Sequence, residues 1–259
     1  MSKSFIGVLA VAALSVSAVG AHAALLFDRD VTANVIMGTG IANGGFTTLT
    51  AGGVEVGLRA RERFDLASNA PSGVTGSQGN GTYIQNAGKA TGAGVPAWMP
   101  NAARWNFDWS VNTGTASVGT YTYRMGLDFD AGVGVNPLTL LTFDPISGSY
   151  ADHSFGNNGT AQSGGTEAAL GDTATYATLK STSTLVQNSW NYDFFDSILF
   201  PFDPNAQGTY SIFLEVIGTN GVVARSDITV IADVPEPSSL ALMGLALAGM
   251  VGVSRRKRA

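Results

Sequence analysis

The sequence predicts an all-β protein: an antiparallel β-sandwich or jelly-roll-like single domain with long loops rich in Gly, Ser and Asn. Three observations lead to this prediction. Apolar and polar residues alternate with a period of two in several segments. Turn residues separate these segments, and 33 of the 259 residues are glycine. No amphipathic helix of ten residues or more is evident between residues 24 and 233.

The clearest alternation lies in residues 54–61, 104–111 and 120–129. We expect three half-buried antiparallel strands there, because each segment has one apolar and one polar face. The apolar faces consist of Val54, Val56, Leu58 and Ala60, then Trp105, Phe107, Trp109 and Val111, and then Tyr121, Tyr123, Met125, Leu127 and Phe129. The polar faces, expected in water, consist of Glu55, Gly57, Arg59 and Arg61, then Arg104, Asn106, Asp108 and Ser110, and then Thr120, Thr122, Arg124 and Asp128.

The remaining strands are predicted from other patterns. Residues 138–143 and 192–200 are more continuously apolar, which favours inner strands. Residues 209–217 and 222–231 form the clearest hairpin, since Asn220-Gly221 is a dipeptide that tight hairpin turns prefer. Between strands lie long loops, notably residues 68–97 and 148–171, whose roles the sequence does not reveal.

The N-terminal residues have the pattern of a secretory signal peptide. Lys3 supplies a positive charge, residues 5–19 are largely apolar, and Ala21-His22-Ala23 is a small-x-small cleavage pattern. We therefore expect the secretion machinery and signal peptidase to act on residues 1–23. Residues 24–233 then form one exported extracellular domain.

The C-terminal residues 234–259 combine three features in a fixed order. Pro235, Glu236 and Pro237 end the folded body, because proline fits neither a helix interior nor a central strand. An uncharged apolar run, residues 240–253, predicts a membrane helix; from Ser238 to Val253 it would reach about 24 Å, short of a hydrocarbon core of about 30 Å. A basic cluster follows it, and such clusters stay on the cytoplasmic side. Its members are Arg255, Arg256, Lys257 and Arg258.

This ending resembles the PEP-CTERM sorting signal. The resemblance implies processing by an exosortase, a membrane-embedded cysteine peptidase, in a Gram-negative type of envelope. It also implies frequent association with exopolysaccharide or biofilm. The expected location is the outer cell surface or the extracellular space, after transient anchoring in the inner membrane through the C-terminal helix. An ordinary membrane anchor that is never cut is the alternative.

Composition excludes several classes of function. Between the two terminal segments, nine basic and eighteen acidic residues leave a net charge of about −9. Nucleic acid is therefore not an expected partner, because phosphate binding needs the opposite field. The chain has no cysteine, which excludes disulfides, thiol catalysis and thiolate metal sites.

Few residues offer chemistry. His153 is the only histidine outside the signal peptide, and we interpret it as an exposed loop residue, because its neighbours Asp152 and Ser154 cannot face it as a triad requires. Asp128 and Asp130 end one predicted strand on one face, where they could act as glycosidase carboxylates or bind Ca²⁺. Further acids near strand ends are Asp144, Asp193, Asp196 and Asp203. Solvated turn aspartates are the simpler interpretation, so we expect no cofactor and leave a weak calcium site open.

The aromatic residues allow two interpretations, a buried core or an exposed face on which sugar rings stack. Strand alternation favours the core. The residues concerned are Trp105, Trp109, Tyr121, Tyr123, Trp190, Tyr192, Phe194 and Phe195. Trp98 differs because it lies in a loop bounded by Pro96 and Pro100, and it is the better candidate for an exposed contact.

Two functions follow as hypotheses. The first is a non-enzymatic surface or matrix protein that contacts extracellular polysaccharide. The second is a secreted polysaccharide-active enzyme or carbohydrate-binding module that uses aspartate pairs and aromatic platforms. The sequence favours the first, because it shows no catalytic histidine or cysteine.

Overall fold

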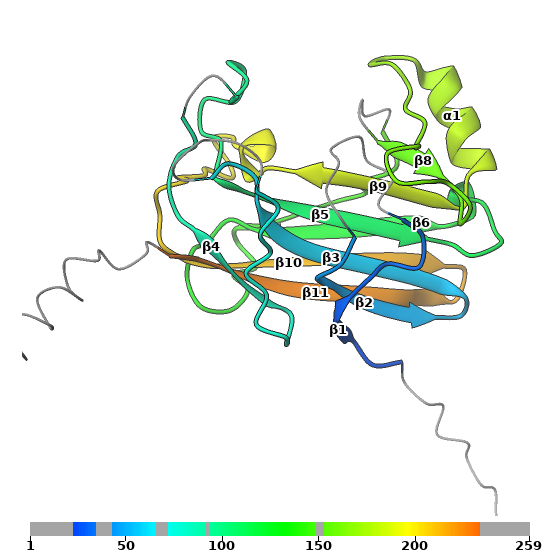
Figure 1. Ribbon diagram of the computed structural model, residues 1–259, viewed down its shortest axis with the longest axis horizontal. Coiled ribbons are helices and arrows are strands. Elements are labelled where there is room, and N and C mark those ends of the chain that lie inside the picture. Colours follow the sequence, from blue (N-terminus) through cyan, green and yellow to red (C-terminus); the bar gives the residue numbers. More distant parts are fainter. Residues whose placement is uncertain (1–22, 35–42, 66–71, 92–93, 149–152, 234–259) are drawn as a thin grey trace, which may run out of the picture.

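The computed structural model describes residues 23–34, 43–65, 72–91, 94–148 and 153–233, which form two β-sheets (Figure 1). The expected signal peptide and the expected C-terminal helix lie outside the described residues. So do the sorting residues Pro235, Glu236 and Pro237 and the basic cluster that follows them.

Both sheets are built from strands that are distant in sequence. Sheet A has six strands in the order β1 (Leu26–Arg29), β2 (Phe46–Ala51), β3 (Val54–Glu62), β5 (Trp105–Asn112), β9 (Leu185–Trp190) and β8 (Ser154–Gly156). Sheet B has five strands in the order β4 (Thr82–Asn86), β11 (Gly221–Asp233), β10 (Gly208–Gly218), β6 (Thr122–Asp128) and β7 (Leu140–Phe143). The helices are η1 (Val118–Thr120), α1 (Thr173–Thr182) and η2 (Tyr192–Phe195).

The all-β prediction is confirmed, and the two sheets share one hydrophobic core. The apolar faces predicted for β3, β5 and β6 all contribute to it. The ring of Trp105 packs against those of Tyr192 and Tyr210, with centroids 5.2 and 5.8 Å away. The aromatic residues of the strands are therefore core residues, as their alternation favours.

Sheet A differs from the prediction, because β3 and β5 are buried on both faces. Residues 31–34 and 43–44 cover part of the polar face that the sequence places in water. Val31 packs over Gly57, where an added Cβ would lie 2.8 Å from the valine Cγ1. Further along this segment, the side chain of Gln187 donates a hydrogen bond to the carbonyl oxygen of Asn34 (3.2 Å). Polar side chains are tolerated there because they bind the main chain of the segment that covers them.

Several local predictions are also wrong. Residues 192–200 do not form a strand, because the Asn191 side chain accepts a hydrogen bond from Asp193 N and starts η2. The nearby strand is β9, which alternation does not reveal because polar residues lie on both of its faces. Residues 138–143 contain β7, but at the edge of sheet B instead of its interior.

The two long loops contain regular structure. Residues 82–86 form β4, which pairs with β11 in parallel, so the sheets are not wholly antiparallel. In β4 Tyr83 and Gln85 are buried while Ile84 is 46% exposed, so a polar residue points inward and an apolar one outward, against the pattern that predicts a strand. Residues 154–156 form β8.

A ten-residue helix, α1, lies beside β8 at one end of sheet A (Figure 1). Asp172 caps its N-terminus by accepting a hydrogen bond from Thr175 N (3.0 Å). Tyr176 is the only buried residue of α1, and its ring meets that of Phe155 edge-on. One buried residue gives no amphipathic pattern, which is why the sequence does not reveal this helix.

The predicted hairpin is confirmed as β10 and β11, whose register pairs Gly218 with Gly221. The turn residues are thus Thr219 and Asn220, and the positive φ of 111° falls on Gly221. A bulge after Val216 shifts the register by one residue. The inward residues of β10 are buried as predicted; they are Tyr210, Ile212, Leu214 and Val216.

Gly126 gives a direct test of the packing on the outer face of sheet B. It lies opposite Phe213 of β10, and a Cβ at this position would lie 2.1 Å from the ring carbon Cε1. We expect Gly126→Ala to lower the free energy of unfolding by about 1–3 kcal/mol, because the ring has to move. Urea unfolding measures this. Thr122→Ala, at an exposed position of the same strand, is the control and should change much less; equal effects would contradict the packing.

Candidate functional site

The structure separates the two aspartates that the sequence places on one face. Asp128 is fully buried and accepts hydrogen bonds from Asp130 N, Asn136 N and Thr139 Oγ1 at 3.1, 2.8 and 2.9 Å. Asp130 is in the loop that these bonds organise. It accepts hydrogen bonds from Asn136 Nδ2 and Gly132 N. Both bonds lower the pKa of Asp130, and the bond from Asn136 has the larger effect. The two carboxylates hold a loop together and do not face each other across an open site.

His153 is not the exposed loop residue that the sequence suggests. It is 1% exposed, and its Nε2 lies 2.8 Å from the carbonyl oxygen of Pro145. Its ring contacts three aromatic rings from distant segments: Trp109, Tyr176 and Trp190. Burial by residues so far apart in sequence leaves no local signal.

Two of the other predicted acids, Asp144 and Asp203, act locally. Asp144 accepts a hydrogen bond from Ile146 N, and Asp203 accepts one from Asn205 N. Among the described residues, no group of three His, Asp or Glu side chains is placed to hold a metal ion.

Trp98 is exposed, as the sequence predicts. Its side chain is 70% exposed and stacks on Phe194, with ring centroids 5.5 Å apart and planes 30° from parallel. We call this pair, Trp98 and Phe194, the aromatic platform. The next residue, Met99, is buried in a small cluster with Phe64 and Ala102. This contact fastens the loop and leaves the tryptophan outside.

Asn191 joins the two halves of the platform. It is fully buried, and its side-chain Nδ2 donates to the carbonyl oxygens of Ala103 and Trp105, both at 3.0 Å. Its Oδ1 accepts a hydrogen bond from Ala103 N (3.0 Å) and another from Asp193 N (3.2 Å). One side chain thus ties the end of the Trp98 loop to the start of η2, which presents Phe194.

Polar groups surround the platform. Asp193 Oδ1 accepts a hydrogen bond from Asn101 N (3.1 Å), and Asn101 Nδ2 donates to Asp196 Oδ2 (3.0 Å). Burial raises the pKa of Asp193, and the neighbouring charge of Asp196 adds to this. The platform therefore combines an exposed aromatic surface with carboxylate and amide groups at its edge.

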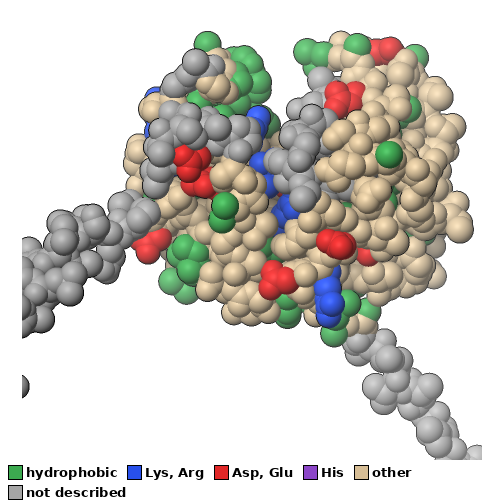
Figure 2. Space-filling model, viewed as in Figure 1, with side chains coloured by type: hydrophobic (Ala, Val, Ile, Leu, Met, Phe, Trp, Pro, Cys, Tyr) green, Lys and Arg blue, Asp and Glu red, His purple; other side chains and the backbone are tan. Residues whose placement is uncertain are grey.

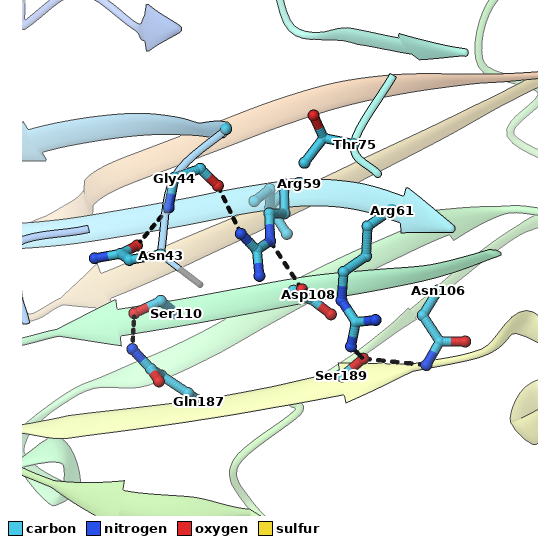
Figure 3. Close-up of polar contacts among 12 residues, drawn as sticks. Asn43, Gly44, Arg59, Arg61, Thr75, Asn106, Asp108, Ser110, Gln187 and Ser189 are labelled. Carbon is cyan, nitrogen blue, oxygen red and sulfur yellow. Dashed lines mark hydrogen bonds and ion pairs between the residues drawn. The ribbon is translucent and has the colours of Figure 1, made fainter. Parts of the chain in front are cut away.

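A second polar group lies on the covered outer face of sheet A, where the sequence predicts solvent. Arg59 Nε and Arg61 Nε both donate to one oxygen of Asp108, Oδ2, at 2.8 and 2.7 Å (Figure 3). All three side chains are at most 2% exposed. We call these three residues the ion cluster. Burial of Asp108 raises its pKa, but the charges of Arg61 and Arg59 outweigh burial, and the pKa lies below its ordinary value.

Neighbouring groups complete the ion cluster. Arg59 Nη1 donates to the carbonyl oxygen of Gly44 (2.6 Å), and Arg61 Nη2 donates to Ser189 Oγ (3.1 Å; Figure 3). Arg59 and Arg61 alternate on β3, and Asp108 lies on the same face because it is the register partner of Arg59 on β5. Alternation alone does not distinguish a buried charged face from a wet one.

The comparisons with known proteins concern the end of the chain. Residues 233–257 match the model of the PEP-CTERM protein-sorting motif. The chain carries a PEP-CTERM sorting signal. The match contains Pro235, Glu236 and Pro237, the apolar run and the basic cluster up to Lys257, so the sequence interpretation is confirmed. No curated protein matches the chain.

The PEP-CTERM motif indicates an exported protein that an exosortase processes. None of the helices in the described part of the chain has the length and apolar character needed to span a membrane. The helix expected at residues 240–253 is not among them.

The ion cluster predicts a large loss of stability on removal of its one negative charge. Asp108→Asn leaves two buried guanidinium groups without a carboxylate, and breaking a buried pair in this way costs about 3–5 kcal/mol. Urea unfolding at pH 7 should show this loss. Because the native pKa of Asp108 is lowered, its ionised form stabilises the fold fully above about pH 4, and this contribution disappears as pH falls through the native pKa.

The matched control is Asp227→Asn. Asp227 also pairs with an arginine, Arg225, but its side chain is 47% exposed, and exposed pairs contribute about 1 kcal/mol or less. A loss for Asp108→Asn no greater than that of the control would contradict the account of the ion cluster.

Proposed function

We propose that this exported protein is a non-enzymatic component of the cell surface or extracellular matrix that binds polysaccharide through the aromatic platform. The observation that carries the proposal is the exposed ring of Trp98, stacked on Phe194 and bordered by carboxylate and amide groups. Large exposed aromatic side chains at fixed positions are typical of binding surfaces.

The platform is organised before any ligand arrives. Met99 anchors one side of the loop in a buried cluster, and Asn191 ties its other side to η2. A surface that is already ordered loses little conformational entropy on binding, so more of the contact energy appears as affinity.

The border of the platform favours a neutral glycan over an acidic one. Asp193 and Asp196 accept hydrogen bonds, which suits the hydroxyl groups of a sugar. The same carboxylates repel a chain of uronic acids. We therefore take the ligand to be a neutral polysaccharide.

The alternative, a polysaccharide-active enzyme that uses Asp128 and Asp130, gains no support from the geometry. Both oxygens of Asp128 are occupied by donors of its own loop, and its side chain is fully buried. Glycoside hydrolysis needs two carboxyl groups that flank a bound sugar.

Substitution of Trp98 tests the proposal. We expect Trp98→Ala to weaken binding of the exported protein to exopolysaccharide from the producing cells by about tenfold or more, because truncation of a central aromatic residue has effects of this size. The midpoint of urea unfolding should stay unchanged, since the side chain is 70% exposed. Affinity electrophoresis in gels with this polysaccharide, with neutral dextran and with acidic alginate measures the binding.

Two controls accompany this experiment. Trp98→Phe retains a ring and should retain most of the affinity, whereas Leu138→Ala removes a side chain that is 88% exposed on another loop and should change nothing. Release of reducing ends from the polysaccharide, lost in Asp128→Asn or Asp130→Asn, would overturn the non-enzymatic proposal.

The sorting signal gives a separate prediction. Replacing Pro235 and Pro237 by Ala should leave the protein uncut and retained in the membrane, because these residues define the motif that precedes the apolar run. Intact mass and cell fractionation measure the outcome. An unchanged mature mass and location would refute exosortase processing at these residues.

A further inference from the structure

The outer face of sheet A contains more buried positive charge than its carboxylates neutralise. Asp108 is the only described carboxylate that pairs with Arg59 or Arg61, and both arginines use the same oxygen of it. The nearest acid on the same face of β3 is Glu55, which accepts hydrogen bonds from Thr32 N and Thr32 Oγ1 instead. The ion cluster therefore has a net charge of +1 in a low-dielectric setting, where an unneutralised charge is costly.

A third arginine adds to this surplus. Arg63 directly follows β3 and has the same parity as Arg59 and Arg61, so it extends their row along the outer face. It is half-buried and forms no ion pair with a described residue. Burial lowers the pKa of Arg63, and the charge of Arg61 lowers it further, whereas the charge of Asp108 raises it. Arg63 therefore interacts electrostatically with both Arg61 and Asp108.

The ion cluster also has hydrogen-bonding capacity that the described residues do not use. Arg61 is fully buried, yet its Nη1 has no hydrogen-bond partner among them, while its Nε and Nη2 both have one. Arg104 is 7% exposed, and its buried Nε also has no hydrogen-bond partner among the described residues. Buried polar groups are almost always paired. The two unused donors, Arg61 Nη1 and Arg104 Nε, outnumber the one unused acceptor of the ion cluster, Asp108 Oδ1, and so indicate a place for a further acceptor.

The molecular surface shows a route to this face. In Figure 2, Lys and Arg side chains lie along the floor of a furrow over the middle of the sheet. Figure 1, drawn from the same side, shows β3 and β5 beneath this position.

We propose that the outer face of sheet A binds a small oxyanion, a carboxylate or a phosphate group, between Arg61 and Arg63. The negative charge neutralises the surplus of the ion cluster, and one oxygen accepts the unused N–H of Arg61. Guanidinium groups suit this role because their planar fork matches the two oxygens of a carboxylate or phosphate. This site is independent of the aromatic platform. It lies on β3 and the residues that follow it and is positively charged, whereas the platform lies on a loop and η2 and is bordered by carboxylates.

Anion titration of the exported protein tests the proposal. Inorganic phosphate and acetate are the probes, with chloride at matched ionic strength as the reference. We expect at least one oxyanion to raise the thermal midpoint in a saturable manner, because a ligand that binds only the native state stabilises it. The probe with the larger effect identifies the ligand as phosphate-like or carboxylate-like. If neither exceeds chloride, the proposal is wrong.

Two substitutions locate the site. Arg63→Gln removes a half-buried side chain without breaking an ion pair, so the variant should fold and bind the oxyanion about tenfold more weakly, the effect of losing one charge-assisted hydrogen bond. Arg61→Gln should abolish binding. Because that variant breaks a buried pair and can fail to fold, Arg63→Gln decides the outcome.

The matched control is Arg124→Gln, which removes the same charge from the outer face of sheet B, where Arg124 pairs with Glu215 and is 51% exposed. It should leave oxyanion binding unchanged. Equal affinity for wild type and Arg63→Gln, or equal weakening by Arg63→Gln and Arg124→Gln, would overturn the assignment of the site.

Discussion

The shared carboxylate of Asp108 is the interaction on which sheet A depends. It holds two arginines of β3 against β5 at the centre of a sheet that is buried on both faces. Such a face cannot be covered by apolar packing alone, so the covering segment binds it through main-chain groups, as Gly44 does with Arg59. The result is a layer of irregular chain over part of the sheet. The position of this layer depends on bonds to charged side chains as well as on packing.

The limits of sequence-based prediction have the same origin. The inner faces of β3, β5, β6 and β10 were predictable because a long alternating pattern has one apolar face and one core to bury it. Whether the polar face meets water depends on segments elsewhere in the chain, so the burial of Arg61 was not predictable. His153 is a similar case, since its aromatic neighbours come from β5, β9 and α1. Trp98 was predictable because prolines close to it exclude a strand, whereas its partner Phe194 was not, because η2 begins at a side-chain cap.

The aromatic platform and the core are connected through Asn191. This residue is fully buried and bonds to the main chain of Ala103 and of Trp105, the first residue of β5, which packs against Tyr192 and Tyr210. The position of an exposed ring is therefore set by hydrogen bonds in the interior. Such an arrangement gives a loop the precision of the sheet to which it is attached.

The end of β11 determines how the body meets its sorting signal. Pairing with β4 extends to Asp233, whose carbonyl oxygen accepts a hydrogen bond from Ala87 N (2.7 Å), and the matched motif begins at this same residue. The folded body and the matched motif therefore meet in the sequence without intervening residues. A pulling force applied at Asp233 would act along β11, in shear against its eleven register pairs with β10. A mechanical load thus reaches the centre of sheet B, where many hydrogen bonds resist it together.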